Sequence, residues 1–290
     1  GMSDTTILPK SDRDAHDIAH LKLVPRRHLG RKITAAVVLL LVGLLIRAFV
    51  VGEIEWRVVG QFLFAPVILK GIWNTLLMTV CAMSLGIFLG VVIAIMRISG
   101  NPVLEVIALV YIWIFRGAPA LLQLLLWFNL ALIFPTMGIP GLFQFNTVEV
   151  MTPFVAAMLG LGIQQGAYTS EVVRSGLLSV DSGQYEAAQT IGMTRMQTLR
   201  RIVLPQAMRV MVPPVGNEVI SMVKLTSLAS VIQYSEILHN AQVIYYANTR
   251  VLELLMVASF WYLVIVTVLS LVQSRIERHY ARGTRGRTTL

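Results

Sequence analysis

The chain has 290 residues, of which 56% are hydrophobic and only 13% are charged, and its mean hydropathy is +0.72. These values exclude an ordinary water-soluble domain and indicate a polytopic membrane protein. The net charge of +9 comes without any recognisable nucleic-acid-binding module, so we expect no nucleic-acid partner.

The chain begins with a polar stretch followed by an isolated apolar segment. Residues 1–32 combine Asp, Arg, His and Lys with few large apolar side chains, which predicts a solvated cytoplasmic arm. The apolar segment 33–51 is either a signal peptide or a retained membrane helix. About thirty hydrophilic residues precede it and no small-residue cleavage pattern follows it, so we interpret it as an additional transmembrane helix.

Five further segments are apolar enough to cross a hydrocarbon core, which takes about 20 helical residues. They are residues 71–96, 103–134, 153–173, 210–232 and 251–272. The segment 103–134 contains the sequence RGAP at 116–119, where glycine and proline predict one kinked or re-entrant crossing. We therefore predict an all-α polytopic membrane protein with about six transmembrane helices.

Basic residues are distributed unevenly between the two ends of these segments. Of the 24 Lys and Arg residues, 18 fall on the side of the N-terminal arm, the loop after segment 153–173 and the C-terminal end, and only three fall on the opposite side. The positive-inside rule therefore predicts that both termini are cytoplasmic, in a bacterial plasma (inner) membrane. Residues 276–290 are predicted to form a basic cytoplasmic tail whose charge sets the topology in preference to binding lipid headgroups or RNA, and the apolar helices are expected to contact membrane lipid.

The loop before segment 210–232 is too polar to lie within a bilayer. Its sequence, SGQYEAAQTIGMTRMQTLRRIVLP (182–205), predicts a short helix capped by Ser182, a break at Gly192, and a second helix that stops before Pro205. Apolar residues recur at helical spacing in both helices, so the hairpin has an apolar stripe to bury. A bilayer surface and a groove on a soluble partner would both accept such a stripe.

The same loop contains residues at fixed spacings. Glu186, Ala187 and Ala188 are followed after three residues by Gly192, after nine more by Ile202, and then by Leu204 and Pro205. This pattern resembles the EAA motif of ATP-binding-cassette (ABC) importer permeases, E-A-A-x3-G-x9-I-x-L-P. Further stretches are similar to the polar amino acid (His, Glu, Gln, Arg or opine) branch of the type I importers, namely GIWNTL (71–76), RGAPALLQL (116–124), AYTSEVVRSG (167–176) and NEVISMVKLTSLASVI (217–232).

This resemblance implies a permease domain at 65–275, built on five helices and preceded by the extra helix 33–51. It implies two ATP-binding-cassette ATPase subunits, a second permease subunit in a homo- or heterodimer, and an extracytoplasmic solute-binding protein that delivers an amino acid substrate. The loop 183–205 would dock on the ATPase through the coupling residues Glu186, Ala187, Ala188, Gly192, Ile202, Leu204 and Pro205. The sequence contains no G-x-x-x-x-G-K-[ST], so we expect no catalytic residue, metal or cofactor in this chain, with ATP and Mg²⁺ bound by the partner ATPase.

Polar side chains inside the apolar segments are candidates for the translocation path, because such groups are costly in hydrocarbon and usually face a bundle interior or water. Residues at helical spacing share one face of each segment. The candidates for the path or substrate are Gln164, Tyr168, Glu171, Asn217, Ser221, Lys224, Asn74 and Thr75. The alternatives are an interhelical network, favoured for Glu171 with Arg174, and a helix cap, favoured for Asn74 and Thr75.

An ion-gradient-coupled secondary transporter of amino acids is the alternative function, because such transporters also place polar groups beside broken helices. The loop motif is the feature that argues against it. A membrane enzyme is a weaker alternative, since the sequence contains no H-E-x-x-H, no G-x-S-x-G and no Cys/His ligand cluster.

Overall fold

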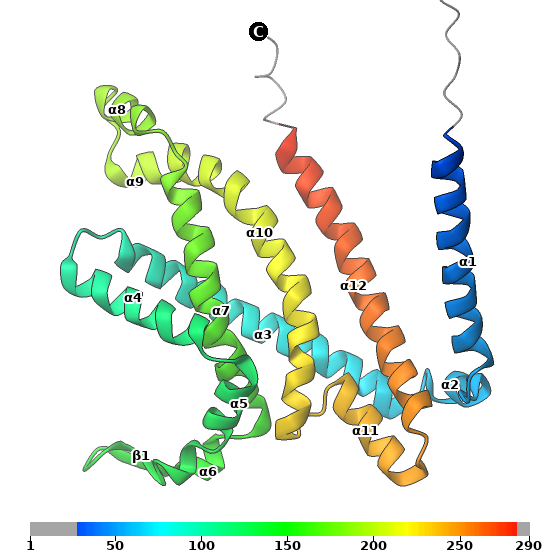
Figure 1. The fold of residues 1–290 in the computed structure, drawn as a ribbon. Helices are drawn as coiled ribbons and strands as arrows, with labels where there is room; N and C mark the ends of the chain where they lie inside the picture. Colours follow the sequence, from blue (N-terminus) through cyan, green and yellow to red (C-terminus); the bar gives the residue numbers. More distant parts are fainter. Residues whose placement is uncertain (1–27, 283–290) are drawn as a thin grey trace, which may run out of the picture. The chain divides into compact units, whose positions relative to one another are not determined.

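A computed structural model describes residues 28–282 of the chain (Figure 1). Most of the predicted N-terminal arm and the end of the predicted basic tail lie outside these residues. The chain divides into two compact units, residues 1–54 and residues 55–290. The first unit contains the helix α1 (Leu29–Val51), which is long and apolar enough to cross a membrane and begins four residues before the predicted segment.

The second unit is almost entirely helical, which confirms the predicted all-α class. Its first half contains α2 (Trp56–Phe62), α3 (Pro66–Arg97), α4 (Pro102–Gly117), α5 (Ala120–Phe128), the 3₁₀ turn η2 (Leu130–Leu132), the strands β1 (Thr136–Ile139) and β2 (Phe143–Asn146), and α6 (Thr147–Val150). Its second half contains α7 (Pro153–Leu178), α8 (Ser182–Thr190), α9 (Arg195–Thr198), the π turn η3 (Leu199–Val203), α10 (Leu204–Leu225), the 3₁₀ turn η4 (Thr226–Ile232), α11 (Ile237–Asn248) and α12 (Val251–Ala281).

Within the described residues, four helical runs are long and apolar enough to cross a membrane: α1, α3, the run Arg195–Ile232, and α12. The pair α4 and α5 passes the same test together and bends by 102° at the predicted RGAP break. Helix α7 lies at the predicted segment 153–173, the fourth of the six predicted spans, and has 26 residues, but it is too polar to pass. Its two adjacent glutamines, its glycines and its Thr, Ser and Tyr residues lower the hydropathy, and Glu171 and Arg174 lower it further.

The helices α3 and α7 pack closely because small residues face each other. A Cβ atom added to Gly86 of α3 would lie 2.6 Å from the Gln165 side chain, and one added to Gly162 of α7 would lie 2.7 Å from the Leu85 side chain. Lipid provides no hydrophobic drive between helices, so close backbone approach is the main source of attraction. The central helix contact of this unit is thus formed by glycines four residues apart on each helix, Gly86 and Gly90 of α3 and Gly162 and Gly166 of α7.

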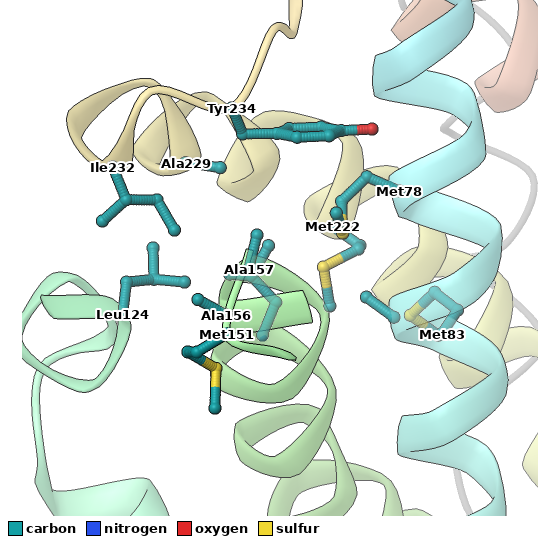
Figure 2. Packing of buried hydrophobic residues seen from close by; sticks show 12 residues of the cluster. Met78, Met83, Leu124, Met151, Ala156, Ala157, Met222, Ala229, Ile232 and Tyr234 are labelled. Atoms are coloured by element: carbon teal, nitrogen blue, oxygen red, sulfur yellow. The ribbon is translucent and has the colours of Figure 1, made fainter. Parts of the chain in front are cut away.

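The largest apolar cluster joins α3, α5, α7, α10 and η4 (Figure 2). Figure 2 shows Met78 of α3, Leu124 of α5, Ala157 of α7 and Met222 of α10 converging on one region, with Ile232 of η4 beside Leu124. All five side chains are buried. The broken span and the end of α10 are therefore packed against the same pair of helices, α3 and α7.

Candidate coupling site and translocation path

The candidate coupling hairpin comprises α8, α9 and η3 and connects α7 to α10 (Figure 1). The cap of its first helix differs from the prediction. Asp181, not Ser182, is the N-cap, and its side chain accepts a hydrogen bond from the Gly183 N–H at 2.7 Å. Ser182 is the first residue of the helix. A carboxylate at the N-cap also interacts favourably with the positive end of the helix dipole.

The chain reverses at Gly192, as the sequence predicted. Gly192 has φ +78°, a conformation that side-chain-bearing residues adopt at a cost, and the Met193 N–H closes the turn by donating to the Ala188 carbonyl at 3.0 Å. A capping box then starts α9. Thr194 Oγ1 accepts from the Gln197 N–H at 3.2 Å, and Gln197 Oε1 accepts from the Thr194 N–H at 2.9 Å.

The predicted helix stop before Pro205 is wrong. The helical run continues from Arg195 through the π turn η3 into α10, and Pro205 lies in the first turn of α10. The Leu204 N–H donates to the Leu199 carbonyl, which is the wide π pattern. Proline lacks the N–H that a continuous helix would use, and the π turn just before Pro205 is where this run departs from the regular α pattern. The hairpin is therefore joined to α10 without a break.

The apolar stripe of the hairpin is divided between two faces. Val203 and Ala188 are buried, and Val203 packs with Ala94, Val173 and Ala207 at the ends of α3, α7 and α10. In contrast, Ile191 is 75% exposed and Met196 is 64% exposed. The hairpin also holds a hollow of about 340 Å³, lined by Tyr185, Gln189, Met193, Arg195, Thr198 and Leu199. Of the remaining motif residues, Glu186, Ala187, Gly192 and Pro205 are exposed, and Ile202 and Leu204 are half-buried.

The path candidates on α7 and those on α10 each form a polar stripe along one helix face, and both stripes lie at or near the surface of this single chain. On α7, Gln164 and Glu171 are half-buried and Tyr168 is exposed. On α10, all three candidates, Asn217, Ser221 and Lys224, are exposed. A hollow of about 250 Å³ between the two helices is lined by Glu171, Val172, Ser175, Val210 and Pro214.

A buried polar network that sequence reasoning missed links α7 to α10. Glu218 Oε2 accepts hydrogen bonds from Gln165 Nε2 at 2.9 Å and from Thr169 Oγ1 at 2.8 Å, and Gln165 Nε2 lies 3.0 Å from Thr169 Oγ1. Gln165 and Thr169 stand four residues apart on one helix face, and Glu218 is acidic within an apolar helix. That combination is a signal that could have indicated the network.

Glu171 lies between two arginines. Its carboxylate pairs with Arg97 at the end of α3 and with Arg174 of α7, the latter at 3.4 Å. The contact with Arg174 is the one that the sequence favoured, and the contact with Arg97 adds α3 to the network. In a membrane protein, burying a charged group that is paired with groups of opposite charge costs less free energy than burying an isolated charge.

Asn74 and Thr75 do not begin a helix, so the favoured cap interpretation is wrong. Helix α3 begins at Pro66, and both residues lie inside it. Asn74 Nδ2 donates to the Ser235 carbonyl at 2.8 Å, and Thr75 Oγ1 accepts from the Ile237 N–H at 3.2 Å. These two side chains therefore hold the connection between η4 and α11 against α3.

The break between α4 and α5 has two polar supports. Gln123 is buried and its Nε2 donates to the Phe115 and Ala118 carbonyls, at 3.3 and 2.9 Å, which the bend leaves without helical partners. The Arg116 guanidinium lies over the Tyr168 ring of α7, 5.2 Å from its centroid. Arg116 thus anchors the break to α7.

A second missed residue, Glu236, lies fully buried in the connection between η4 and α11. Its carboxylate accepts from the backbone N–H groups of Leu238 at 3.0 Å and His239 at 2.7 Å, and from the Tyr262 hydroxyl of α12. Burial raises the pKa of Glu236 to about 7, against the lowering effect of these hydrogen bonds. The sequence showed only an acidic residue in a loop, with no sign that the loop was buried.

Comparison with known proteins identifies the family of this chain. The family described as "Binding-protein-dependent transport system inner membrane component" matches residues 86–286, which includes the coupling hairpin and both polar stripes. The chain belongs to this family. It is a multi-pass inner-membrane component of a transport system, not an enzyme, and systems of this family work with a separate ATPase and a binding protein.

Curated members of the family are similar over most of this chain. The arginine transport system permease protein ArgU of Corynebacterium glutamicum is 39% identical, with 90% of this chain and 83% of that protein covered. The L-cystine transport system permease protein TcyB of Bacillus subtilis is 39% identical over 79% of this chain and 92% of its own length. The glutamine transport system permease protein GlnP of Escherichia coli K12 is 32% identical over 78% and 97%.

Solved structures agree with this assignment. A chain in a crystal structure described as an amino acid ABC transporter with histidines is 32% identical, with a TM-score of 0.65, and 76% of this chain and 97% of that chain are covered. A chain of the MetNI methionine ABC transporter in an inward-facing conformation is 20% identical, with a TM-score of 0.56 over 74% and 96%, and it supports the fold alone.

Proposed function

We propose that this chain is the permease subunit of an ATP-driven importer of polar amino acids. Two permease chains, identical or related, would form the membrane core, and two ATPase subunits would bind ATP and Mg²⁺ on the cytoplasmic side. A binding protein would deliver the substrate from the outside. Both termini of this chain would be cytoplasmic, in line with the distribution of its basic residues.

The observation that carries this proposal is the continuity between the coupling hairpin and α10. The hairpin exposes the apolar side chains Ile191 and Met196 and also holds a hollow of about 340 Å³, and both would offer a docking surface to a soluble partner. From α9 onward the backbone is helical through η3 into α10. A displacement of the hairpin by the ATPase would therefore be transmitted to the membrane part of α10, where Asn217, Ser221 and Lys224 lie.

The exposed polar stripes support a path between two permease chains. Lys224 is exposed on α10 in the single chain, and a charge that faces lipid at membrane depth costs about 2.5–3.5 kcal/mol or more. A second permease that covers this face would place the stripes along a water-filled path. The candidates for contact with substrate are Gln164, Tyr168, Glu171, Asn217, Ser221 and Lys224, with Asn74 and Thr75 in a supporting position on α3.

The substrate class follows from the relatives and from the chemistry of the stripes. The named relatives are described as transporting arginine, cystine and glutamine. The stripes combine amide, hydroxyl, carboxylate and ammonium groups, which suit the charged and polar ends of an amino acid or an opine. The proposal is therefore restricted to polar amino acids and their close relatives.

The experiment is ATP-dependent uptake by the reconstituted transporter. The full chain would be co-purified with its ATPase, placed in proteoliposomes with its binding protein, and supplied with radiolabelled arginine, glutamine, histidine and cystine in turn. We expect uptake of at least one of these that requires ATP, and a mass of the intact complex that corresponds to two permeases and two ATPases. Uptake that follows a proton or sodium gradient and ignores ATP would contradict the proposal.

A further inference from the structure

The two-stranded hairpin of β1 and β2 has one apolar face and one polar face. Its register pairs Met137 with Phe145 and Ile139 with Phe143, so these four side chains share one face. The opposite face carries the remaining pairs, Thr136 with Asn146 and Gly138 with Gln144. The apolar face is partly uncovered in this chain, since Phe143 is 56%, Ile139 51% and Met137 37% exposed and Phe145 is half-buried. Leu142, at the tip of the hairpin, is 78% exposed.

The base of this hairpin is fixed to the rest of the unit. The buried Thr147 donates through its hydroxyl to the Phe134 carbonyl, and its N–H donates to the Pro135 carbonyl at 3.1 Å. The rings of Phe143 and Phe145 are parallel, with 6.4 Å between their centroids. The apolar face therefore has a defined orientation. Figure 1 shows the hairpin extending sideways beside α6, at the end of the helices opposite to α8 and α9.

Charge distinguishes between the possible occupants of the apolar face. The sequence contains no charged residue between Arg116 and Glu149. A binding protein docks and leaves, so its docking surface is exposed to water for part of each cycle, and such transient interfaces keep a polar rim. An uncharged patch of Met, Ile, Leu and Phe would be poorly suited to that task. It is well suited to permanent contact with lipid.

The patch is also continuous with apolar surface that leaves the broken span. The chain between η2 and β1 begins with Ile133 and Phe134, which are both exposed, and Leu132 at the end of η2 is 83% exposed. The peptide groups on the outer edges of a two-stranded sheet have no partner strand, so they need water and are not tolerated in the hydrocarbon core. The level that satisfies both the apolar face and these edges is the headgroup interface, where aromatic residues are also enriched.

We propose that the hairpin 136–146 lies in the plane of the membrane, with the face of Met137, Ile139, Phe143 and Phe145 in the headgroup and upper acyl region of the outer leaflet. This inference rests on the proposed orientation, in which the coupling hairpin is cytoplasmic. It gives the hairpin the role of a lipid anchor that holds the outer end of the broken span at the membrane surface. The polar face of Gln144 and Asn146 is directed to water.

The test is a depth measurement on the full chain, co-purified with its ATPase and placed in nanodiscs. Cys81 is replaced by alanine, and a nitroxide label is attached to Ile139→Cys or, as the matched control on the other face of the same hairpin, to Gln144→Cys. We expect the label at 139 to collide several-fold more with oxygen, which concentrates in lipid, than with a water-soluble nickel complex. We expect the reverse preference at 144.

Three results would overturn the proposal. Equal access of the nickel complex to both labels would place the hairpin in water. Protection of the label at 139 from both reagents would mean that a protein surface, such as the second permease, covers this face. Loss of the oxygen preference when saturating binding protein is added would identify a docking site for that protein. Leu142→Cys, at the exposed tip, repeats the measurement if Ile139→Cys does not co-purify with the ATPase, and the readout does not depend on transport.

Discussion

At the scale of single residues, two glycines have the same backbone conformation in different settings. Gly192, in the coupling hairpin, has φ +78°, and Gly100, in the turn between α3 and α4, has φ +74°. A Cβ atom would meet no other atom within 4 Å at either position. Substitution is therefore opposed at both by backbone strain alone, which makes the two positions a matched pair.

We predict that Gly192→Val weakens the association of the chain with its ATPase, while Gly100→Val leaves it unchanged. A side chain with a branched Cβ in the left-handed region costs roughly 1–2 kcal/mol and would shift the reversal between α8 and α9. The measurement is the amount of ATPase that co-purifies with each variant, normalised to membrane-inserted permease. Equal retention of the ATPase by both variants would argue against docking through this hairpin.

Glu236 makes stability dependent on pH. Its pKa rises from the usual 4.5 to about 7 because the carboxyl group is buried. Between these two values the native protein keeps a proton that the unfolded chain has lost. The free energy of unfolding therefore falls as the pH rises from about 4.5 to about 7, and this contribution is absent above the upper value.

We predict that Glu236→Gln removes much of this dependence. Its thermal unfolding midpoint, compared with that of the unmodified protein, should rise from about pH 5 to about pH 7 and then level off, because the amide has no charge to bury. Glu149→Gln, at an exposed position in α6, serves as the control for the loss of a carboxyl group. A difference for Glu236→Gln that is constant with pH would refute the assignment of a buried titrating group.

At the scale of elements, the contact between α3 and α7 organises the unit. Gly90 faces Thr169, and a Cβ atom added to Gly90 would lie 2.8 Å from Thr169 Cβ and 3.0 Å from the Ser170 backbone nitrogen. Thr169 in turn donates to Glu218 of α10 at 2.8 Å. Helix spacing and the buried polar network therefore depend on the same glycine.

We predict that Gly90→Leu separates α3 from α7 and destabilises the protein by about 1–3 kcal/mol, the usual effect of overpacking a close contact. The measurement is the thermal unfolding midpoint in detergent. Gly60→Leu in α2 is the control, because a Cβ atom there meets nothing within 4 Å. A midpoint for Gly90→Leu that matches the control would show that the helices do not need this close approach.

At the scale of the whole molecule, the chain consists of two units of different importance to the family fold. The match to the family covers 86–286, inside the second unit of 55–290. The boundary of that unit lies before α2, where Val59 and Phe62 pack into the apolar cluster of α11 and α12. The Trp261 indole N–H of α12 also donates to the Leu63 carbonyl at 2.7 Å.

We predict that removal of residues 1–54 leaves a permease that inserts and co-purifies with its ATPase, because the second unit retains its own contacts. Removal of residues 1–65 should fail both tests, since it also deletes Val59, Phe62 and the carbonyl that Trp261 contacts. Membrane fractionation and co-purification measure both outcomes. Equal failure of the two truncations would show that the first unit is required for folding.

Much of the helical layout and the coupling hairpin followed from local pattern. Long apolar runs place the spans, Gly-Pro chemistry marks the bend after Arg116, and the spacing from Glu186 to Pro205 indicates the family. Each of these signals is contained in a short stretch of chain, so it can be recognised without knowledge of the fold. The predictions of a cap at Ser182 and of a helix end before Pro205 were wrong. Serine is also a common N-cap residue, and proline usually ends a helix.

What the sequence by itself determined was the class of the protein, most of its helical spans and the motif that indicates its family, because apolar length and fixed spacing are properties of the chain. Only the tertiary structure decided which polar residues meet. Gln165, Thr169 and Glu218 come together, as do Glu236 and Tyr262, through contacts between helices that are distant in sequence. Such contacts depend on which helix faces turn toward each other, and periodicity alone does not specify the partner of a face.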